Sequence, residues 1–520
     1  MSGASGSYSA ATYNAVTWLL DRNVEEGRGH KLAFTDTVSE LSYGELQVQS
    51  RRLANLLRRL GVRREERVAM IMLDTVDFPI VFLGAIRAGI VPVPLNTLLT
   101  SDQYAYVLAD CRARVLFISE ALLPVVRDML GRMPDLEHVV VSGANAHGYK
   151  KLSDEIARET DDFTTVATHA DEPAFWLYSS GSTGMPKGVR HLHSSLAATA
   201  ETYAKQVLGI REDDVGLSAA KLFFAYGLGN ALTFPMSVGA STVLNAERPT
   251  PALMFALLRK YDPSIFFGVP TLFAAMLNDE SLKSEPRFPR LRVCTSAGEP
   301  LPESVGNNWK GRFGVDILDG VGSTELLHIF LSNAPGDIKY GCSGRPVPGY
   351  KVRLVNEAGS DVADGEVGEL LVDAPSAGEG YWNQRSKSRQ TFAGHWTRTG
   401  DKYTRDAEGR YTFCGRADDM FKVSGIWVSP FEVESALITH PAVAEAAVVP
   451  EADPEGLLKP KAFVVLKAGA ATDGLNDQLK EHVKQKIGPW KYPRWIDVVD
   501  SLPKTATGKI LRYKLREGTG

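Results

Sequence analysis

Short apolar runs alternate with amphipathic segments along the first half of the chain. Ser42 and Glu45 form a capping box, and the leucines that follow at helical spacing predict a helix that ends at Gly61. The spacing at 78–88 predicts a second helix. Buried strands are predicted at 68–73, 90–94, 115–118 and 139–141. Strands that alternate with helices in this way indicate a mostly parallel sheet covered by helices on both faces.

The same alternation continues through the middle of the chain. The pattern predicts helices at 194–207 and 251–260. More strands are predicted at 175–178, 241–244, 265–267 and 291–295. The last of these ends in a turn of small residues, Ser296-Ala297-Gly298.

The texture of the sequence changes at about Gly341, where Gly and Pro become frequent. Short strands predicted at 351–355, 368–372 and 411–414 indicate a β-rich subdomain over about 341–417. The rest predicts an α+β unit, with helices near 433–438 and 475–486 and strands at 443–449 and 462–466. We therefore expect an α/β protein with a large N-terminal body, 1–417, and a small C-terminal domain, 418–520. The predicted boundary is the polar turn 415–419.

Composition excludes several classes of protein. The 520 residues include 58 Lys and Arg and 62 Asp and Glu, a net charge of −4 without a basic stripe, so we expect no nucleic-acid partner. Residues 1–11 lack the basic start and apolar core of a secretory signal, and charges and prolines interrupt the most apolar stretch, 68–95. A cytoplasmic protein without a membrane partner is expected. The four cysteines are widely spaced, which favours buried reduced thiols over a metal site or a disulfide framework.

The segment from Tyr178 to Gly188 carries the strongest chemical signal. It follows a predicted buried strand and reads Tyr-Ser-Ser-Gly-Ser-Thr-Gly-Met-Pro-Lys-Gly. Glycines let the backbone approach a ligand, while hydroxyls and a lysine add donors suited to phosphate oxygens. The segment is not a Walker A loop, because Lys187 is followed by Gly188 rather than by Ser or Thr. We interpret it as a phosphate-binding loop; a plain surface turn is the alternative.

Together with later segments, this loop resembles the signature of the acyl-adenylate-forming superfamily, which includes acyl-CoA synthetases, adenylation domains of peptide synthetases and beetle luciferases. The matching segments occur in the family's order and span nearly the whole chain, at 178–188, 296–300, 319–325, 399–401, 415–425 and 503–509. Within the superfamily, the chain most closely resembles bacterial benzoate–CoA ligases. That resemblance is carried mainly by 223–229 and 319–328.

The resemblance implies a reaction in two steps. The carboxylate of a small aromatic acid attacks the α-phosphorus of ATP, diphosphate leaves, and the thiol of coenzyme A then displaces AMP from the acyl-adenylate. The first step brings an anion to a polyanion, so the site must supply positive charge, through Mg²⁺ and fixed donors. Glu325 is expected to ligate Mg²⁺ and Thr324 to donate to the α-phosphate. Taken alone, Glu325 would instead be interpreted as a surface carboxylate at a helix start.

The resemblance also implies a set of nucleotide contacts. Asp401 is expected to accept from the ribose hydroxyls, and Arg416 to contact the ribose or a phosphate. The expected ATP- and AMP-binding residues are Ser179, Ser180, Gly181, Ser182, Thr183, Gly184, Lys187, Gly298, Glu299, Pro300, Asp319, Gly320, Val321, Gly322, Ser323, Thr324, Asp401, Arg416 and Lys509. The expected catalytic residues are Lys509, Thr183, Glu325 and Lys422.

In the superfamily, the C-terminal domain swings between the two half-reactions, and a few residues absorb the change. By this resemblance Asp418 is the expected hinge, and Lys509 is expected to reach the reacting carboxylate during adenylation. Lys422, Ser424 and Gly425 are expected on the CoA path, with a strand-edge lysine an equal interpretation of Lys422. Because acetylation removes a lysine's charge, control of Lys509 by an acetyltransferase and a deacetylase is a hypothesis. The sequence leaves a homodimer open.

Specificity for the acid should come from an aromatic wall beside small residues. The expected substrate-binding residues are Phe224, Ala225, Tyr226, Ala297, Gly298, Gly322, Leu327, His328 and Ile329. Few charges occur among them, which favours a flat, unsubstituted or weakly substituted ring over an amino acid. Ordinary core packing is the alternative for the aromatic residues.

Two positions depart from the family pattern. Val321 stands where many relatives have an aromatic residue stacked on adenine, and Trp427 stands where acetyl-type synthetases have an arginine. The predicted function is an ATP-dependent benzoate–CoA ligase. The alternatives are a ligase for 4-hydroxybenzoate, 2-aminobenzoate or a medium-chain fatty acid, and, in a different class, a non-catalytic adenine-nucleotide sensor.

Overall fold

A computed structural model describes residues 12–179, 185–279, 281, 287–417, 419–423, 426–454, 457–488, 491–504 and 510–516. The chain divides into two compact units. Unit 1 consists of Met1–Lys351 and Val372–Thr397, and unit 2 of Val352–Leu371 and Arg398–Gly520. The predicted β-rich subdomain, about 341–417, is therefore divided about equally between the two units. Asp418 lies outside the described residues, so a pivot there stays a prediction.

The first sheet of unit 1 has the predicted alternation of strands and helices. It is parallel, with the strand order β4-β3-β5-β6-β7. Its elements are α1 (Tyr43–Arg59), β3 (Arg67–Ile71), α2 (Asp77–Arg87), β4 (Val91–Pro94), α3 (Ser101–Cys111), β5 (Ala113–Ser119), α4 (Leu123–Leu130), β6 (His138–Ser142), β7 (Lys150–Lys151) and α5 (Leu152–Ala157).

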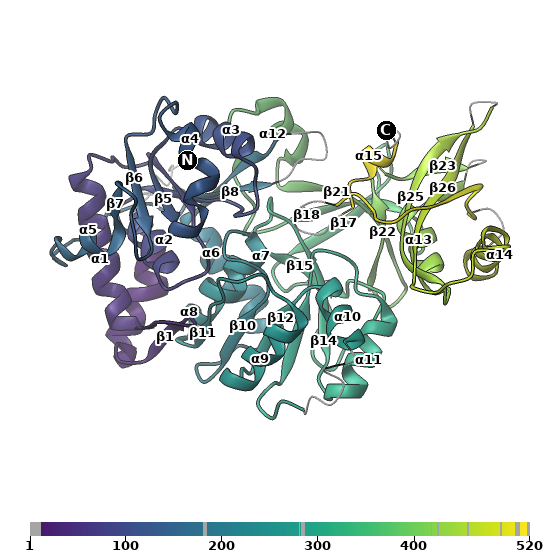
Figure 1. Ribbon diagram of the computed structural model, residues 1–520, viewed down its shortest axis with the longest axis horizontal. Coiled ribbons are helices and arrows are strands. Elements are labelled where there is room, and N and C mark those ends of the chain that lie inside the picture. Colours follow the sequence, from purple (N-terminus) through teal and green to yellow (C-terminus); the bar gives the residue numbers. More distant parts are fainter. Residues whose placement is uncertain are drawn as a thin grey trace, which may run out of the picture. The chain divides into compact units, whose positions relative to one another are not determined.

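Helices cover both faces of this sheet, as the pattern predicts. Met70 and Phe117 pack into one hydrophobic core with residues of α1 and α2, whereas Ile71 and Leu116 pack into another with α3 and α4 (Figure 1). Successive strand residues point to opposite faces, so neighbours in sequence enter different cores. The predicted capping box at the start of α1 is present, with Ser42 N donating to Glu45 Oε2 (2.8 Å).

The second sheet of unit 1 runs in the order β16-β15-β14-β13-β12-β10-β11-β1-β2. The strands from β14 to β1 are parallel, and β2, β15 and β16 are antiparallel additions at the edges. The strands are β1 (Leu32–Thr35), β2 (Glu40–Ser42), β10 (Val215–Ser218), β11 (Ser241–Val243), β12 (Ile265–Gly268), β13 (Val293–Ser296), β14 (Ile317–Gly322), β15 (Ile329–Ser332) and β16 (Arg345–Pro346).

Helices from the middle of the chain cover this second sheet. Phe266 of β12 and Cys294 of β13 share a core with α9 (Pro251–Tyr261), α10 (Pro270–Asn278) and α11 (Glu303–Phe313). The predicted helix at 194–207 is α6 (His193–Thr199), which continues as the π-helical segment η4 (Ala200–Val207). The remaining helices of this region are α7 (Ala225–Leu228), η5 (Gly229–Thr233) and α8 (Phe234–Val238).

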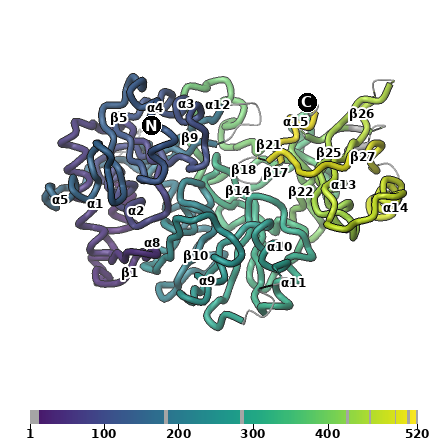
Figure 2. The backbone as a smooth tube through the Cα atoms, in the orientation of Figure 1, coloured from purple at the N-terminus to yellow at the C-terminus, as the bar shows by residue number. Residues whose placement is uncertain are grey.

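A third, small sheet of unit 1 holds the glycine-rich loop. β8 (Pro173–Ser179) and β9 (Lys187–Leu192) are antiparallel, and β19 (Gly380–Tyr381) adds to the other edge of β9. The loop therefore joins two antiparallel strands, and no helix follows it directly. After β19 the chain forms α12 (Arg385–Thr391), which lies beside α3 (Figure 2), and Trp382 Nε1 donates to Asp110 O (2.8 Å).

Unit 2 contains short strands followed by an α+β segment, as predicted. β17 (Lys351–Val355), β18 (Gly368–Asp373), β21 (Trp396–Arg405) and β22 (Tyr411–Arg416) precede the hairpin of β23 (Phe421–Val423) and β24 (Ile426–Val428). α13 (Pro430–Ile438) and α14 (Leu475–Ile487) share a core with the sheet β25-β26-β27. These strands and the last helix are β25 (Val443–Ala452), β26 (Leu458–Leu466), β27 (Trp495–Val498) and α15 (Arg512–Arg516).

The state of the cysteines and the lengths of the helices can be compared with what the composition predicts. No disulfide joins the four cysteines, all of which are described: Cys111, Cys294 and Cys342 are buried, and Cys414 is partly exposed. Within the described ranges, every helix is too short or too polar to cross a membrane.

Candidate active site

Two parallel strands of unit 1 bring the small-residue turn 296–298 and the segment after β14 together. Ser296 at the end of β13 pairs with Asp319 in β14, so the residues that follow both strands leave the sheet at the same edge. Asp319 Oδ2 accepts from the backbone N–H of Leu301, just after the turn 297–300 (3.3 Å). At Gly322 a Cβ would lie 2.5 Å from His328 O, so only glycine fits there.

Asp319 is a buried carboxyl group that has no cationic partner among the described residues. Its relative exposure is 4%, and burial raises its pKa to about 8. Between an ordinary aspartate pKa near 3.8 and this value, the unfolded chain releases the proton and the folded chain keeps it. Stability must therefore fall as pH rises through this range, because the unfolded state binds fewer protons.

We expect Asp319→Asn to remove this pH dependence. The amide is neutral at every pH. As pH rises from about 4 to about 8, the free energy of unfolding of the variant should therefore increase relative to that of the wild type, by at most about 1.4 kcal/mol per pH unit. Urea unfolding of both proteins at a series of pH values, without nucleotide, measures the difference. Parallel stability curves across this range would contradict the assignment.

A carboxylate, a lysine and a phenol meet at the base of the glycine-rich loop. Glu325 Oε1 accepts from the hydroxyl of Tyr381 (2.8 Å) and from Ser179 Oγ (3.5 Å). Lys187 Nζ lies 4.0 Å from the same carboxylate oxygen. Ser179 and Lys187 pair across β8 and β9, which places both ends of the loop at this cluster. The arrangement joins one anion and one cation where the sequence predicts a metal ligand and a phosphate ligand.

This donor set fits a magnesium ion that is brought in by a triphosphate. Among the described residues, no group of three or more His, Cys, Asp and Glu side chains is arranged to hold a metal by itself. Mg²⁺ is ordinarily held by one or two carboxylates together with substrate phosphates, and retains several waters. A single half-buried carboxylate, Glu325, beside a lysine suits that mode.

The segment after Glu325 enters a buried aromatic cluster. His328 Nε2 lies 3.3 Å from Tyr226 O, and its ring packs against Tyr226, Tyr203 and Phe234 at centroid distances of 5.6, 5.3 and 4.5 Å. Burial lowers the pKa of His328 to about 3, so the imidazole is neutral. A Cβ at Gly229 would collide with this ring.

Other predicted acyl-site residues surround the same cluster. Tyr226 OH shares a hydrogen bond with Thr295 Oγ1 (2.6 Å), directly before the turn 296–298. Ala225 packs against the core that contains Leu327, and Ile329 pairs with Gly322 across β14 and β15. Five of the predicted positions are at least partly exposed beside these buried residues: Phe224, Ala225, Tyr226, Gly298 and Gly322. The rings of the cluster therefore offer apolar and aromatic surface, and the buried carboxyl of Asp319 is close enough to act electrostatically on Tyr203 and Tyr226.

The remaining predicted residues divide between unit 2 and the part of the chain that is not described. In unit 2, Arg416 Nη1 donates to Asp401 Oδ1 (2.7 Å), because the two residues pair across β21 and β22. The backbone of Lys422 pairs with Trp427 in the β23–β24 hairpin. The predicted residues outside the described ranges are Ser180, Gly181, Ser182, Thr183, Gly184, Asp418, Ser424, Gly425 and Lys509.

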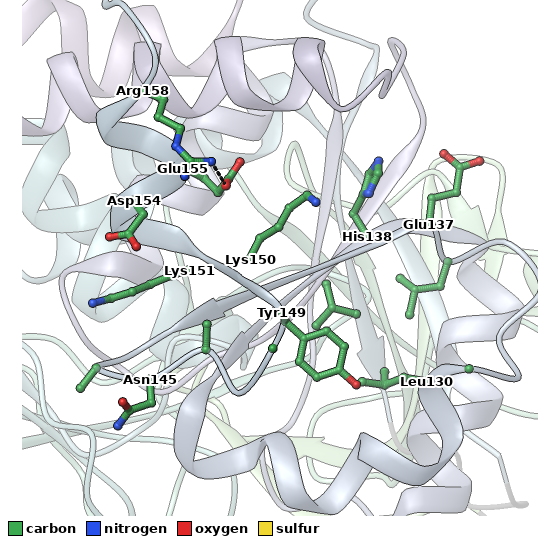
Figure 3. A pocket seen from close by; sticks show the side chains of 16 residues that line it. Leu130, Glu137, His138, Asn145, Tyr149, Lys150, Lys151, Asp154, Glu155 and Arg158 are labelled. Atoms are coloured by element: carbon green, nitrogen blue, oxygen red, sulfur yellow. Dashed lines mark hydrogen bonds and ion pairs between the residues drawn. The ribbon is translucent and has the colours of Figure 1, made fainter.

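A pocket of about 860 Å³ lies elsewhere in unit 1, along β6 and β7 (Figure 3). It is lined by side chains of both signs, and Arg158 donates to Glu155 (2.7 Å) at its rim. None of the predicted site residues lines it. We assign the chemistry to the Glu325 cluster rather than to this pocket, because the cations of the pocket lie among carboxylates and belong to none of the family segments.

Sequence reasoning missed Tyr381, which contacts both charged residues of the cluster. Its only sequence signal is its place in the run Gly378-Glu-Gly-Tyr-Trp382, where small residues flank two aromatic ones. Tyr381 lies 56 residues from Glu325. No local pattern links positions so far apart, so the contact becomes visible only in the folded chain.

Comparison with known proteins gives a consistent result. Residues 20–382 match the family described as AMP-binding enzyme, and residues 432–509 match the AMP-binding enzyme C-terminal domain. The chain is 57% identical to a 4-hydroxybenzoate–CoA/benzoate–CoA ligase of Rhodopseudomonas palustris, over 98% of this chain and 94% of that protein. It is 55% identical to a benzoate–CoA ligase of Thauera aromatica, over 97% and 96% of the two chains.

Solved structures show the same similarity. A benzoate CoA ligase from Burkholderia xenovorans is 50% identical and superposes with a TM-score of 0.89, covering 97% of this chain and all of that one. An anthranilate CoA ligase in complex with anthranoyl-AMP is 43% identical, with a TM-score of 0.92 and 97% of each chain covered.

Proposed function

Because the chain belongs to the AMP-binding enzyme family, we propose that it is an AMP-forming ligase that activates benzoate with ATP and transfers the benzoyl group to coenzyme A. One observation carries the proposal. The segment 322–328 between β14 and β15 bears both the carboxylate that faces Lys187 and the histidine of the aromatic cluster. A metal-triphosphate ligand and a flat aromatic acid would therefore meet over one short stretch of backbone.

The residues of unit 1 suit the first half-reaction. Lys187 and the hydroxyl-rich loop supply positive charge and donors for phosphate oxygens, which lowers the repulsion between a carboxylate and a polyanion. Mg²⁺, when bound through Glu325, would neutralise charge on the phosphates. The neutral His328 offers no counter-ion to the benzoate carboxylate, so the acid group is not held inside the aromatic cluster. The ring packs and the carboxylate is left for the α-phosphorus.

The roles of the C-terminal residues in the two half-reactions rest on the family motifs. We infer that Lys509 assists adenylation and then withdraws, that the chain pivots at Asp418, and that Lys422, Ser424 and Gly425 line the path of CoA. The nucleotide would also contact Asp401 and Arg416, which already lie together in unit 2. A carboxylate accepts from both ribose hydroxyls, and a guanidinium suits a phosphate oxygen.

Benzoate is the preferred acid because the cluster is formed by aromatic rings and the neutral His328. The relative that is 57% identical is named for 4-hydroxybenzoate as well as benzoate, and the structure that is 43% identical is named for anthranilate, which is 2-aminobenzoate. 4-Hydroxybenzoate is therefore the second candidate. 2-Aminobenzoate and medium-chain fatty acids complete the panel to be compared. Initial rates of diphosphate release for each acid, measured as kcat/KM, would rank them.

The proposal predicts acid-dependent exchange of diphosphate into ATP. Incubation with labelled diphosphate, ATP and benzoate, without CoA, should return label to ATP, because the acyl-adenylate forms reversibly before the thiol takes part. Omission of benzoate should abolish the exchange. If no label returns under conditions in which benzoyl-CoA still accumulates, the adenylate mechanism is wrong. Nucleotide binding without any exchange or product would favour the sensor, and release of ADP would favour a phosphohydrolase.

Three further proposals concern the cell and the assembly. We infer that the protein is cytoplasmic and that Lys509 is a target of an acetyltransferase and a deacetylase. We also propose a homodimer, which light scattering can test. Acetylation would remove the positive charge on which adenylation depends. A fully acetylated preparation with unchanged activity would refute the regulation.

A further inference from the structure

We propose that Tyr381 is a positioning residue that holds Lys187 and Glu325 4.0 Å apart, short of a hydrogen-bonded ion pair, and so preserves the site for a magnesium-bound triphosphate. The inference rests on the proposed function, because it assigns Glu325 to the metal and Lys187 to the phosphates. It adds a residue that none of the sequence motifs includes.

The side chain of Tyr381 contacts both charges at once. Its hydroxyl donates to Glu325 Oε1 (2.8 Å), and Lys187 Nζ donates to the same hydroxyl (3.4 Å). The ammonium also lies over the phenol ring, 4.3 Å from its centroid. Lys187 and Glu325 themselves remain 4.0 Å apart. The phenol thus supplies a donor to the anion and both an acceptor and a π face to the cation.

Three contacts of the surrounding chain hold Tyr381 in this place. It pairs with Val189 where β19 adds to β9, two residues after Lys187. Its backbone N–H donates to Ser388 Oγ (3.0 Å), and its ring packs edge-on against Phe392 at 5.4 Å. The side chain is 5% exposed. A residue fixed on both its backbone and its ring can hold a geometry that two flexible charged side chains cannot hold by themselves.

The charges would otherwise attract each other strongly. The side chains of Lys187 and Glu325 are 16% and 18% exposed, so their attraction is less screened than that of a surface pair. A direct ion pair would use the lysine donors on the carboxylate, and an incoming metal-triphosphate would have to break it. With the phenol in contact with both, each charge already has a neutral partner that a phosphate or a metal ion can displace.

The test is equilibrium binding, which needs no turnover. Tyr381→Phe keeps the ring and removes only the hydroxyl. We expect it to weaken the binding of ATP in the presence of Mg²⁺ about tenfold, measured by calorimetry without aromatic acid or CoA. Binding of AMP, which has no diphosphate, should change less than twofold by the same physical argument. Unchanged ATP binding, or an equal loss for ATP and AMP, would overturn the proposal.

Controls separate positioning from general damage. Tyr104→Phe is a matched change, since that buried hydroxyl donates to Asn96 O (2.8 Å) in another part of unit 1, and it should leave ATP binding unchanged. In a Lys187→Met background no ion pair can form, so adding Tyr381→Phe should have no further effect on ATP binding. The same loss in both backgrounds would overturn the proposal.

Ser388→Ala covers the case in which Tyr381→Phe does not fold. It removes the backbone anchor without touching the ring, so it should weaken ATP binding less, in the same direction, and leave AMP binding unchanged; no change for ATP would overturn the proposal. Failure of the proposed function is distinguishable, because diphosphate exchange would then be absent from the wild type while the binding results still decide the role of Tyr381.

Discussion

Lys509→Ala should slow acyl-adenylate formation about 100- to 1,000-fold, the usual effect of removing one group that stabilises transition-state charge. Thioester formation from supplied benzoyl-AMP and CoA should be nearly unchanged, since the lysine is assigned to the first half-reaction only. Diphosphate exchange measures the first step, and benzoyl-CoA formed from synthetic benzoyl-AMP measures the second. Because Lys509 acts through its charge, Lys509→Arg should lose less than Lys509→Ala.

The chain around Lys509 makes a local effect reasonable. Lys504 and Ile510, on either side of the segment, form a β-bridge, and Arg512 of α15 donates to the buried Glu434 (2.7 Å). These contacts hold the flanking chain without the Lys509 side chain. Lys514→Ala, an exposed lysine of α15, is the matched control and should leave both half-reactions unchanged. Equal loss in both half-reactions for Lys509→Ala would contradict the assignment.

A change at the predicted hinge should affect the two half-reactions in the opposite way. Asp418→Pro should leave diphosphate exchange intact and impair the reaction of benzoyl-AMP with CoA, because proline fixes φ and restricts the residue before it at the point where the chain must rotate. A normal second step would remove Asp418 as the pivot. Together with Lys509→Ala, the variant separates the two half-reactions from opposite sides.

Arg87→Met should lower the free energy of unfolding by about 3–5 kcal/mol, the usual cost of removing one partner of a buried ion pair. The guanidinium of Arg87 is fully buried and donates through Nη1 and Nη2 to both carboxylate oxygens of Asp21 (3.0 and 2.7 Å). It also donates to Thr165 Oγ1 (2.6 Å) and to Ser50 Oγ (3.2 Å). Without it, the buried carboxylate of Asp21 keeps the hydrogen bond from Gln47 Nε2 (2.8 Å) but loses the cation of this pair.

Urea unfolding monitored by tryptophan fluorescence measures the loss. Arg158→Met is the matched control: its side chain is 68% exposed and pairs with Glu155, so it should cost at most about 1 kcal/mol. Adding Asp21→Leu to Arg87→Met should restore much of the stability, because no unpaired charge remains in the core. If Arg87→Met unfolds at the same urea concentration as Arg158→Met, the pair does not stabilise unit 1.

Many elements could be predicted because their signals are local. The capping box at Ser42 and the leucines after it define α1, and the apolar run at 113–119 defines β5, since burial on both faces leaves no polar alternation. The glycine-rich loop was identified from residue types alone. Its antiparallel setting was not, because pairing between β8 and β9 depends on where the chain turns, and the sequence pattern there is equally compatible with a strand followed by a helix.

By itself, the sequence determined the order of strands and helices, the presence of a phosphate-type loop and the family to which the chain belongs, since caps, periodicity and motifs lie within short windows. Tertiary structure alone decided which distant side chains meet. Arg87 contacts Asp21, which lies 66 residues away in the sequence. Tyr381 contacts Glu325 at a separation of 56 residues, and His328 contacts Tyr226 at a separation of 102. Each contact joins polar groups that burial makes costly to leave unpaired, and packing, rather than sequence neighbourhood, selects the partner.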